Sequence, residues 1–396
     1  MAEWIECKIS DIGTVVGGAT PSTKKPENYE NGTIAWITPK DLSTFTGRYI
    51  QRGERNITEV GLKSCSTQLL PKDTVLFSSR APIGYVAIAA NEVCTNQGFK
   101  SVVPNENTDP LFLYYLLKHN KDKIEGMGSG TTFKEVSGNT MKNIVVSVPT
   151  DKKVQKRISS MLGSIDDKIE ENERINNNLL EQVITLYRNR FVDTVNDERR
   201  ICRADEYFDI SIGKTPPRKE PQWFSTNPQD VTWVSISDMG TCGLYISSSS
   251  EQLTREAVDR HNVKVVPDNT VLLSFKLTVG RIAITNGEMT TNEAIAHFKT
   301  DKKEINEYLY CYLKCFNYQT MGSTSSIATA VNSKIIKGMP FVVPTDNELK
   351  EFHDLAAPMF ANIKANQIET DNLVALRDTL LPKLMSGELD VLDIDL

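Results

Sequence analysis

A long apolar stripe near the middle of the chain limits its fold more than any other feature. Between Asp151 and Asp193, apolar residues recur at a spacing near 3.5 residues, charged residues occupy the other faces, and no proline interrupts the pattern. This pattern predicts one continuous helix about 65 Å long at ~1.5 Å per residue. Such a helix is longer than a single globular core usually needs.

The same stripe returns near the C-terminus, 194 residues further on, and both copies have asparagine at the third of five heptad positions. A polar residue in an apolar seam costs stability but fixes register. We therefore expect the helices to pair as an antiparallel coiled coil, with Asn172 and Asn366 close together. We also expect Pro358 to kink the second helix or to mark the start of its regular part. The alternative is two unrelated amphipathic helices, each lying on its own domain. The seam positions are Ile158, Ile165, Asn172, Leu179 and Leu186, and Phe352, Met359, Asn366, Leu373 and Leu380.

The globular parts of the chain repeat as well. Residues 201–343 follow residues 1–150 at low identity and at a nearly constant offset, for example Pro267 to Ile284 after Pro71 to Ile88. Each copy mixes short β-rich runs with a helical segment, so we predict an α+β fold for each. Four regions follow: globular domains over 1–150 and 201–343, a helical region over 151–200, and a second helical region with an acidic tail over 344–396.

Charge and composition fit a soluble protein but do not reveal its ligand. No apolar run approaches the ~18 residues of a membrane span, and the first residues, MAEWIECKIS, lack the basic flank and apolar core of a signal peptide. We therefore expect a cytoplasmic protein with its 7 cysteines reduced. The net charge of −6 comes from residues 344–396, which hold 4 basic and 11 acidic residues. Both globular domains are nearly neutral, so charge neither indicates nor excludes nucleic-acid binding.

Catalytic and metal-binding patterns are missing. The GKT run at Gly213 lacks the earlier glycine of a phosphate loop, because Phe208 stands there. The four histidines are isolated, without the spacing of metal ligands. The acidic residues around Asp166 lie on the long helix, where a charge run is usually solvated. We therefore expect a non-catalytic chain that binds no metal or cofactor itself.

Polar loops at matching places of the two globular domains remain as candidate contact groups. Arg80 and Lys276 follow corresponding strands, and Asn96 corresponds to Asn292. Arginine, lysine, amide and hydroxyl groups are those that read base edges and phosphates. The candidate DNA-binding residues are Lys24, Lys25, Lys40, Ser78, Ser79, Arg80, Asn96, Gln97, Ser129, Thr131, Thr132, Lys134, Arg218, Lys219, Ser274, Lys276, Thr278, Asn292, Ser323, Thr324 and Ser325.

These motifs resemble the DNA-specificity subunits of type I restriction-modification systems. The similar stretches include LFSSRAPIGYVAIA and QKRISSMLGSIDDKIEENERINNNL in the first half, and IGKTPPRKEPQWF and TLLPKLMSGEL in the second. The resemblance implies two target-recognition domains, each reading one half of a bipartite site in double-stranded DNA, and conserved helices that dock two modification subunits. It also implies partners that use S-adenosylmethionine, ATP and Mg, so that the assembled complex is an adenine-N6 methyltransferase and ATP-dependent endonuclease, with restriction subunits where they are present.

Two other classes remain open from the sequence. A two-domain coiled-coil scaffold would bind proteins but not DNA. A self-sufficient DNA enzyme would need catalytic motifs that the chain lacks. Because DNA-reading positions vary widely in the resembled family, the resemblance assigns no base contact to any particular residue.

Overall fold

The computed structural model describes residues 2–130, 134–194, 199–321 and 331–391. Internal contacts divide the chain into two compact units, Met1–Glu171 with Thr370–Leu396, and Asn172–Glu369. Each unit therefore combines one globular domain with a segment of both long helices. The two units are called unit 1 and unit 2 below.

The globular domain of unit 1 contains two sheets and a separate strand pair. The larger sheet has five strands in the order β2-β9-β6-β7-β4, and the smaller has three in the order β5-β3-β8. The first and last strands of the domain, β1 and β10, pair antiparallel. The strands are β1 Trp4–Lys8, β2 Gly13–Gly17, β3 Ile34–Ile37, β4 Tyr49–Ile50, β5 Arg55–Ile57, β6 Val75–Ser79, β7 Ile83–Ala89, β8 Cys94–Thr95, β9 Lys100–Pro104 and β10 Val145–Pro149. The helices are α1 Ile9–Ile12, η1 Pro26–Asn28, α2 Pro39–Ser43, α3 Glu59–Lys63, α4 Pro110–His119, α5 Lys121–Gly126 and α6 Gly138–Asn143.

The globular domain of unit 2 repeats this topology, with one strand added to the smaller sheet. Its larger sheet has the order β12-β20-β17-β18-β15, its smaller sheet the order β13-β16-β14-β19, and β11 pairs with β21. Apart from the added strand β13, the order matches that of unit 1, which supports the predicted duplication. The strands are β11 Arg200–Arg203, β12 Asp209–Ile212, β13 Phe224–Ser225, β14 Val231–Val234, β15 Tyr245–Ile246, β16 Gln252–Leu253, β17 Val271–Ser274, β18 Ile282–Thr285, β19 Thr290–Thr291, β20 Ile295–Lys299 and β21 Pro340–Val343. The helices are α8 Ala204–Tyr207, η3 Pro221–Trp223, α9 Asp238–Thr241, α10 Arg255–Arg260, η4 Lys303–Ile305, α11 Asn306–Cys315, η5 Tyr318–Thr320 and α12 Ser333–Lys337.

Helix α4 shows how local sequence signals and burial act together. Pro110 occupies its first turn, and the carboxylate of Asp109 accepts a hydrogen bond from the amide of Phe112 at 2.9 Å. Six consecutive residues from Phe112 to Leu117 are buried, so α4 is apolar on all sides and lies inside the core. Helix α4 is thus a helical segment of the kind that the sequence predicts for the first domain, and the antiparallel pair β6–β7 supplies two of its β-rich runs.

The two long helices are α7, Lys152–Tyr187, and α13, Asp346–Met385. A π-helical turn, Arg188–Val192, extends α7, so helical structure covers nearly the whole predicted range. In unit 1, α7 contributes Ile158 and α13 contributes Leu384 to one core cluster. In unit 2, a second cluster holds Val183 of α7 together with Phe360 of α13. Each helix thus enters the core of both units, and the alternative of one helix for one domain is wrong.

The predicted role of Pro358 is also wrong in part, because α13 begins well before it, at Asp346. Glu348 and Thr345 form a reciprocal cap at that end: the Glu348 carboxylate accepts from the amide of Thr345 at 3.0 Å, and the Thr345 hydroxyl accepts from the amide of Glu348 at 3.3 Å. Proline removes only the hydrogen bond to the carbonyl of Asp354, an exposed residue that water can reach. Buried Phe352 and Phe360 hold the helix on both sides of Pro358.

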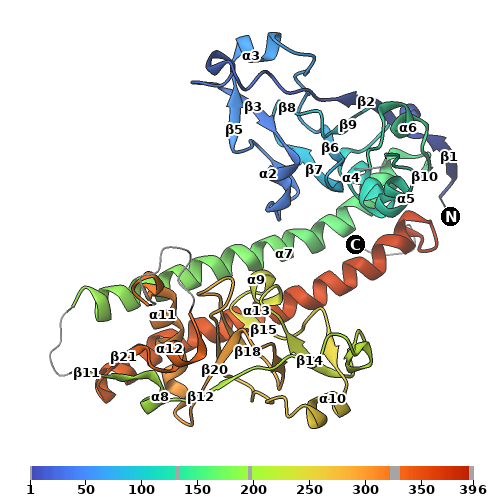
Figure 1. The fold of residues 1–396 in the computed structure, drawn as a ribbon. Helices are drawn as coiled ribbons and strands as arrows, with labels where there is room; N and C mark the ends of the chain where they lie inside the picture. Colours follow the sequence, from blue (N-terminus) through green and yellow to red (C-terminus); the bar gives the residue numbers. More distant parts are fainter. Residues whose placement is uncertain (1, 131–133, 195–198, 322–330, 392–396) are drawn as a thin grey trace. The chain divides into compact units, whose positions relative to one another are not determined.

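Within each unit the two helix segments lie side by side and run in opposite directions (Figure 1). In unit 2, the side-chain amide of Asn172 donates to the carboxylate of Glu369 at 2.8 Å and to the carbonyl of Asn366 at 3.5 Å. In unit 1, Arg377 donates to the carboxylate of Asp166 at 2.9 Å. The predicted proximity of Asn172 and Asn366 is confirmed, and these contacts are consistent with an antiparallel coiled coil.

Candidate nucleic-acid interface

The hairpin between β6 and β7 ends in a turn that two serines hold together. The hydroxyl of Ser78 donates to the carbonyl of Pro82 at 2.9 Å and accepts from the amide of Tyr85 at 2.8 Å. The hydroxyl of Ser79 donates to the carbonyl of Gly98 at 3.2 Å. Both serines are fully buried.

Ser274 stabilises the turn of the β17–β18 hairpin of unit 2 in the same way as Ser78 in unit 1. Its hydroxyl donates to the carbonyl of Thr278 at 2.6 Å and accepts from the amide of Arg281 at 3.0 Å, and it is fully buried. The serines therefore match between the domains because both turns need them. The prediction that Ser78, Ser79 and Ser274 contact DNA is therefore corrected. Their hydroxyls are already hydrogen-bonded inside the fold and could bind a base only if these bonds broke.

The cations at the hairpin tips differ in their surroundings. The side chain of Arg80 is 35% exposed and lies 3.7 Å from the carboxylate of Glu135, which Lys100 also approaches at 3.3 Å. Lys276 is exposed, with its ammonium 5.8 Å from the ring centroid of Phe275. The exposed lysine at the second tip suits a phosphate contact. Arg80 would have to break its ion pair with Glu135 before it could bind DNA.

The paired asparagines stabilise turns, and the residues after them point outward. The side-chain carbonyls of Asn96 and Asn292 accept from the amides of Gly98 at 2.8 Å and Ala294 at 3.1 Å, so each asparagine closes its own loop. Gln97 and Glu293 follow them, are exposed, and each accepts a hydrogen bond from a threonine hydroxyl. The sequence candidates included Gln97 but missed Glu293, although the repeat aligns the two.

The carboxylate of Glu293 lies near two cations, Lys276 and Arg218. Burial raises its pKa, but the hydrogen bond from Thr215 and the charges of Lys276 and Arg218 outweigh that effect and hold the pKa below the usual value. A carboxylate is an acceptor only, and cytosine presents a matching amino donor in the major groove. Glu293 is therefore an additional candidate reader near the tip of the second hairpin.

Arginines stacked on aromatic rings form a second kind of candidate. Arg218 lies over the rings of Phe224 and Trp233, at 4.1 and 4.7 Å to their centroids, and makes two hydrogen bonds of 3.0 and 2.9 Å to Glu251. In unit 1, Arg55 lies 4.1 Å from the ring centroid of Tyr29. The sequence analysis did not predict Arg55 as a candidate, because no motif links it to Tyr29, which is distant in the sequence.

The other candidates lie on loops. Lys40 is exposed and pairs with Glu54 at 2.7 Å. The remaining described candidates are exposed: Lys24, Lys25, Ser129, Lys134, Lys219 and Thr278. The candidates Thr131, Thr132, Ser323, Thr324 and Ser325 lie outside the described residues.

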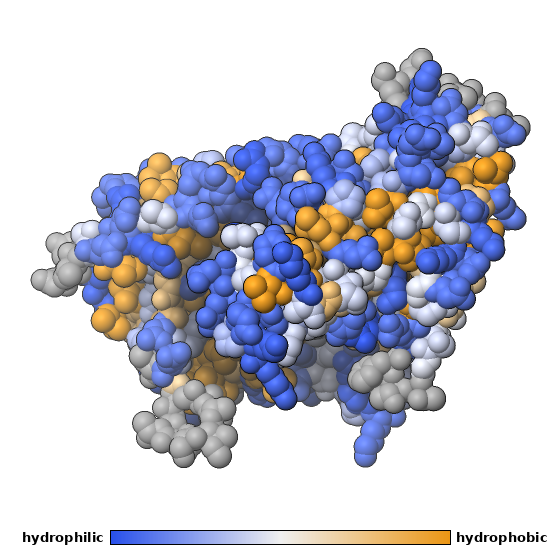
Figure 2. Space-filling view, turned by 90° about the horizontal axis from the view of Figure 1, so that it is seen from above, coloured by the Kyte–Doolittle hydropathy of each residue, from blue (hydrophilic) through white to orange (hydrophobic). Residues whose placement is uncertain are grey.

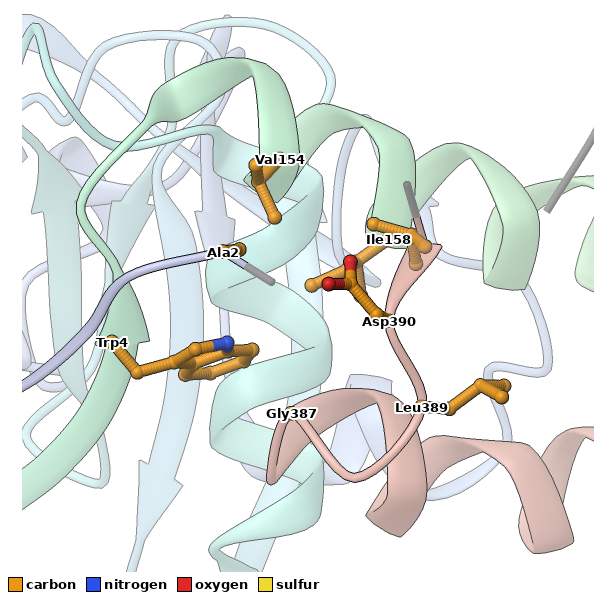
Figure 3. A pocket seen from close by; sticks show the side chains of 8 residues that line it. Ala2, Trp4, Val154, Ile158, Gly387, Leu389 and Asp390 are labelled. Carbon is orange, nitrogen blue, oxygen red and sulfur yellow. The ribbon is translucent and has the colours of Figure 1, made fainter. Parts of the chain in front are cut away.

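A cavity of about 240 Å³ in unit 1 is not a candidate catalytic site. Trp4, Val154, Ile158 and Leu389 give it a mainly apolar lining, and Asp390 supplies one carboxylate (Figure 3). Across the described part of the chain, no group of three or more histidine, cysteine or acidic side chains is placed to hold a metal ion. No helix among the described residues is long and apolar enough to cross a membrane.

Known proteins are similar to this chain in sequence and in fold. The family model for the type I restriction modification DNA specificity domain matches twice, over residues 1–181 and 198–370. The specificity subunit of the type I restriction enzyme MjaIX from Methanocaldococcus jannaschii is 34% identical, over 98% of this chain and 94% of its own length. The HindI specificity subunit from Haemophilus influenzae is 20% identical, over 98% and 100%.

A solved structure supports the fold separately. The crystal structure of the S subunit of a type I restriction-modification system from M. genitalium aligns with a TM-score of 0.57 at 15% identity, covering 97% of this chain and 96% of that one. Together with the doubled family match, these likenesses show that the chain belongs to the family of type I restriction-modification DNA specificity subunits.

Proposed function

We propose that this chain is the DNA sequence-specificity subunit of a type I restriction-modification complex, in which each globular domain reads one half of a bipartite site. The observation that carries the proposal is a contrast inside the duplication. The turn-forming residues Ser78 and Ser274 make the same two kinds of hydrogen bond in both domains. The exposed residues beside them differ, as Gln97 and Glu293 do.

Two readers built on one frame are expected to recognise different sequences. The exposed lysines position the domain on phosphates, which carry no sequence information. The side chains at the tips, such as Arg80 and Lys276 with Gln97 and Glu293, are the groups that can discriminate base edges. In this proposal the chain itself performs no chemistry.

The long helices are the proposed docking surface for two modification subunits. Leu355, Ile368 and Leu376 of α13 remain 50%, 43% and 47% exposed, although leucine and isoleucine gain stability from burial. Figure 2 shows hydrophobic residues in several separate groups among hydrophilic ones on the face in view. The partners would bring S-adenosylmethionine for adenine-N6 methylation, and restriction subunits would add ATP- and Mg-dependent translocation and cleavage, in the cytoplasm.

Methylation mapping tests the proposal directly. Cells carrying this chain and its modification subunit should methylate adenines in one bipartite sequence, and cells lacking this chain should not. The purified complex should bind that duplex more tightly than a scrambled one, and its affinity should fall as salt rises. A complex that assembles but neither binds nor methylates DNA sequence-specifically would instead support the scaffold alternative.

Lengthening both helices tests whether they set the gap between the half-sites. Asn172 and Glu369 are hydrogen-bonded across the two helices, so insertions after Asn172 and after Ile368 face each other. Four inserted residues add about 6 Å and about 40° to each helix. The unspecified gap should grow by one or two base pairs at ~3.4 Å each, while both half-site sequences stay the same. Altered half-sites with an unaltered gap would contradict this role of the helices.

A further inference from the structure

The tip of the β17–β18 hairpin carries a leucine that the fold does not use. Leu277 is 99% exposed, between exposed Lys276 and Thr278. We propose that Leu277 contacts the 5-methyl group of a thymine in the half-site read by the second domain. This inference rests on the proposed function and names one reading residue together with the base that it reads.

The hairpin holds Leu277 in a fixed outward position. The amide of Thr278 donates to the carbonyl of Lys276 at 2.6 Å, and Leu277 between them has a φ of 60°. A three-residue turn with positive φ at its centre is rare and strained. Below the tip, the Ser274 hydroxyl binds the carbonyl of Thr278, and the amide of Gly280 donates to the carbonyl of Ser274 at 3.0 Å.

The first domain shows that this turn does not require a large side chain. Ala81 stands at the same place in the β6–β7 hairpin and also has positive φ, 48°. Glycine adopts this conformation with least strain, and alanine has little apolar surface to leave in water. A leucine at such a position is unfavourable in the free chain on both counts. Its bulk therefore points to a surface that covers it when the chain is bound.

The surroundings of Leu277 favour the major groove of DNA for that surface. Strands β17 and β18 are paired on their outer sides with β20 and β15, so the tip of the hairpin is the part that can enter a groove. The thymine methyl is the apolar group on the base edges of the major groove. Lys276, the residue before Leu277, is exposed, and its charge lowers the pKa of the nearby Glu293 carboxylate, as that of Arg218 does. An apolar side chain next to an exposed cation at the tip of a hairpin suits a thymine flanked by phosphates.

Replacing thymines by deoxyuridine tests this contact, because deoxyuridine lacks only the 5-methyl group. The chain in complex with its modification subunit is titrated with duplexes of the mapped site, each carrying one thymine-to-deoxyuridine change. One position in the second domain's half-site should weaken binding by about four-fold, the change that ~0.8 kcal/mol produces. Leu277→Ala should weaken binding to the thymine duplex and make the complex insensitive to deoxyuridine at that position.

The chain supplies its own controls. Leu277→Ala installs the residue that the first domain has at this place, so the hairpin should keep its hydrogen-exchange protection. Leu277→Met should retain most of the sensitivity to deoxyuridine, because methionine preserves an apolar contact. Deoxyuridine in the other half-site should affect the wild type and both variants equally.

Three results would overturn the inference while leaving the proposed function intact. In the first, the complex binds its site specifically, but at no thymine position does Leu277→Ala change the effect of deoxyuridine. In the second, the half-site of the second domain contains no thymine. In the third, Leu277→Ala lowers the affinity equally for thymine and deoxyuridine duplexes. If that uniform loss came with unstacking of a 2-aminopurine probe by wild type alone, Leu277 would be a wedge between base pairs. A complex without any sequence-specific DNA binding would overturn the proposed function itself.

Discussion

The stability of unit 2 should fall as pH drops from 7 to 5, because of a buried histidine. His297 lies in β20 with no exposed surface, between the hydroxyls of Ser211 at 3.0 Å and Thr291 at 2.7 Å. Burial, with a smaller contribution from the charge of Lys299, lowers the pKa of His297 from 6.5 to about 3. The imidazole is therefore neutral in the folded chain between pH 7 and pH 5.

The sign and size follow from proton linkage. Below pH 6.5 the unfolded chain binds a proton at this histidine, and the folded chain does not. The contribution is complete above the unfolded pKa and is lost as pH falls toward the folded one. One pH unit in that window corresponds to ~1.4 kcal/mol, so we expect a loss of about 2 kcal/mol between pH 7 and pH 5.

The first domain provides the matched variant for this test. In the corresponding strand pair, Val16 faces Ser101 where Ser211 faces His297. The double variant Ser211→Val/His297→Ser copies that pair and removes the titrating group. Its stability can be lower at all pH values, but its pH dependence between 7 and 5 should be about 2 kcal/mol shallower.

Hydrogen exchange of the β17 and β20 amides, corrected for intrinsic rates, measures the stability of unit 2 at each pH. Comparison of the wild type with the double variant cancels other groups that titrate in this window, such as Glu307, whose pKa burial raises. If both proteins lose the same stability between pH 7 and pH 5, the titration of His297 is not the cause.

Two substitutions with matched controls and one double-mutant cycle test the packing of the helices and the tail. Arg48→Met should lower the stability of unit 1 by about 1–3 kcal/mol, because Arg48 is buried and pairs with Asp167 and Glu170 of α7. The control Arg52→Met replaces an exposed arginine and should change the stability by less than ~0.5 kcal/mol. Denaturant unfolding measures both, and equal effects would contradict the role of Arg48. Val391→Asp should expose β1 to hydrogen exchange, because Val391 is 1% exposed in the core that includes Trp4, whereas exposed Glu388→Ala should not. A double-mutant cycle of Asn366→Ala and Asn176→Ala should give a coupling of about 0.5–1.5 kcal/mol from their 2.9 Å hydrogen bond, and independent effects would mean that the bond contributes nothing.

The helices and the duplication could be predicted because periodicity and offset are properties of the sequence itself. Asn172 was placed opposite Asn366 from heptad position alone, and the two are in contact. The start of α13 was placed too late, because the rule for proline ignores that the lost hydrogen bond belongs to an exposed residue, Asp354, and that two buried phenylalanines support the helix. Tertiary burial outweighed a local preference at that point.

The recognition loops were less predictable, because a polar residue in a turn has two possible partners. Ser78 and Ser274 have the composition of reading groups, yet their hydroxyls bind main-chain atoms four residues away. The identity of Ser78 and Ser274 at the same place in both domains already favoured a structural role, because two domains that read different sequences are expected to differ at their base-contacting residues. Leu277 was overlooked for the opposite reason, because only the structure shows that its side chain has no place in the core.

Each domain is held on the helix that follows it in the chain by contacts of a different kind. In unit 1, Arg48, next to strand β4, binds Asp167 and Glu170 of α7. In unit 2, the side-chain oxygen of Gln367 on α13 accepts from the main-chain amide of Tyr245 in β15 at 3.0 Å, and the side-chain nitrogen of Gln367 donates to the carbonyl of Tyr245 at 3.1 Å.

Strands β4 and β15 hold the same place in their sheets, so the docking position was kept after duplication while its chemistry changed from charged to neutral. Asp167 and Glu170 are partly exposed, and salt weakens such pairs, whereas it hardly affects a neutral amide. Unit 1 should therefore lose more of its domain–helix contact in high salt than unit 2. Greater exchange in β15 than in β4 under these conditions would show that Arg48 does not hold the first domain by charge.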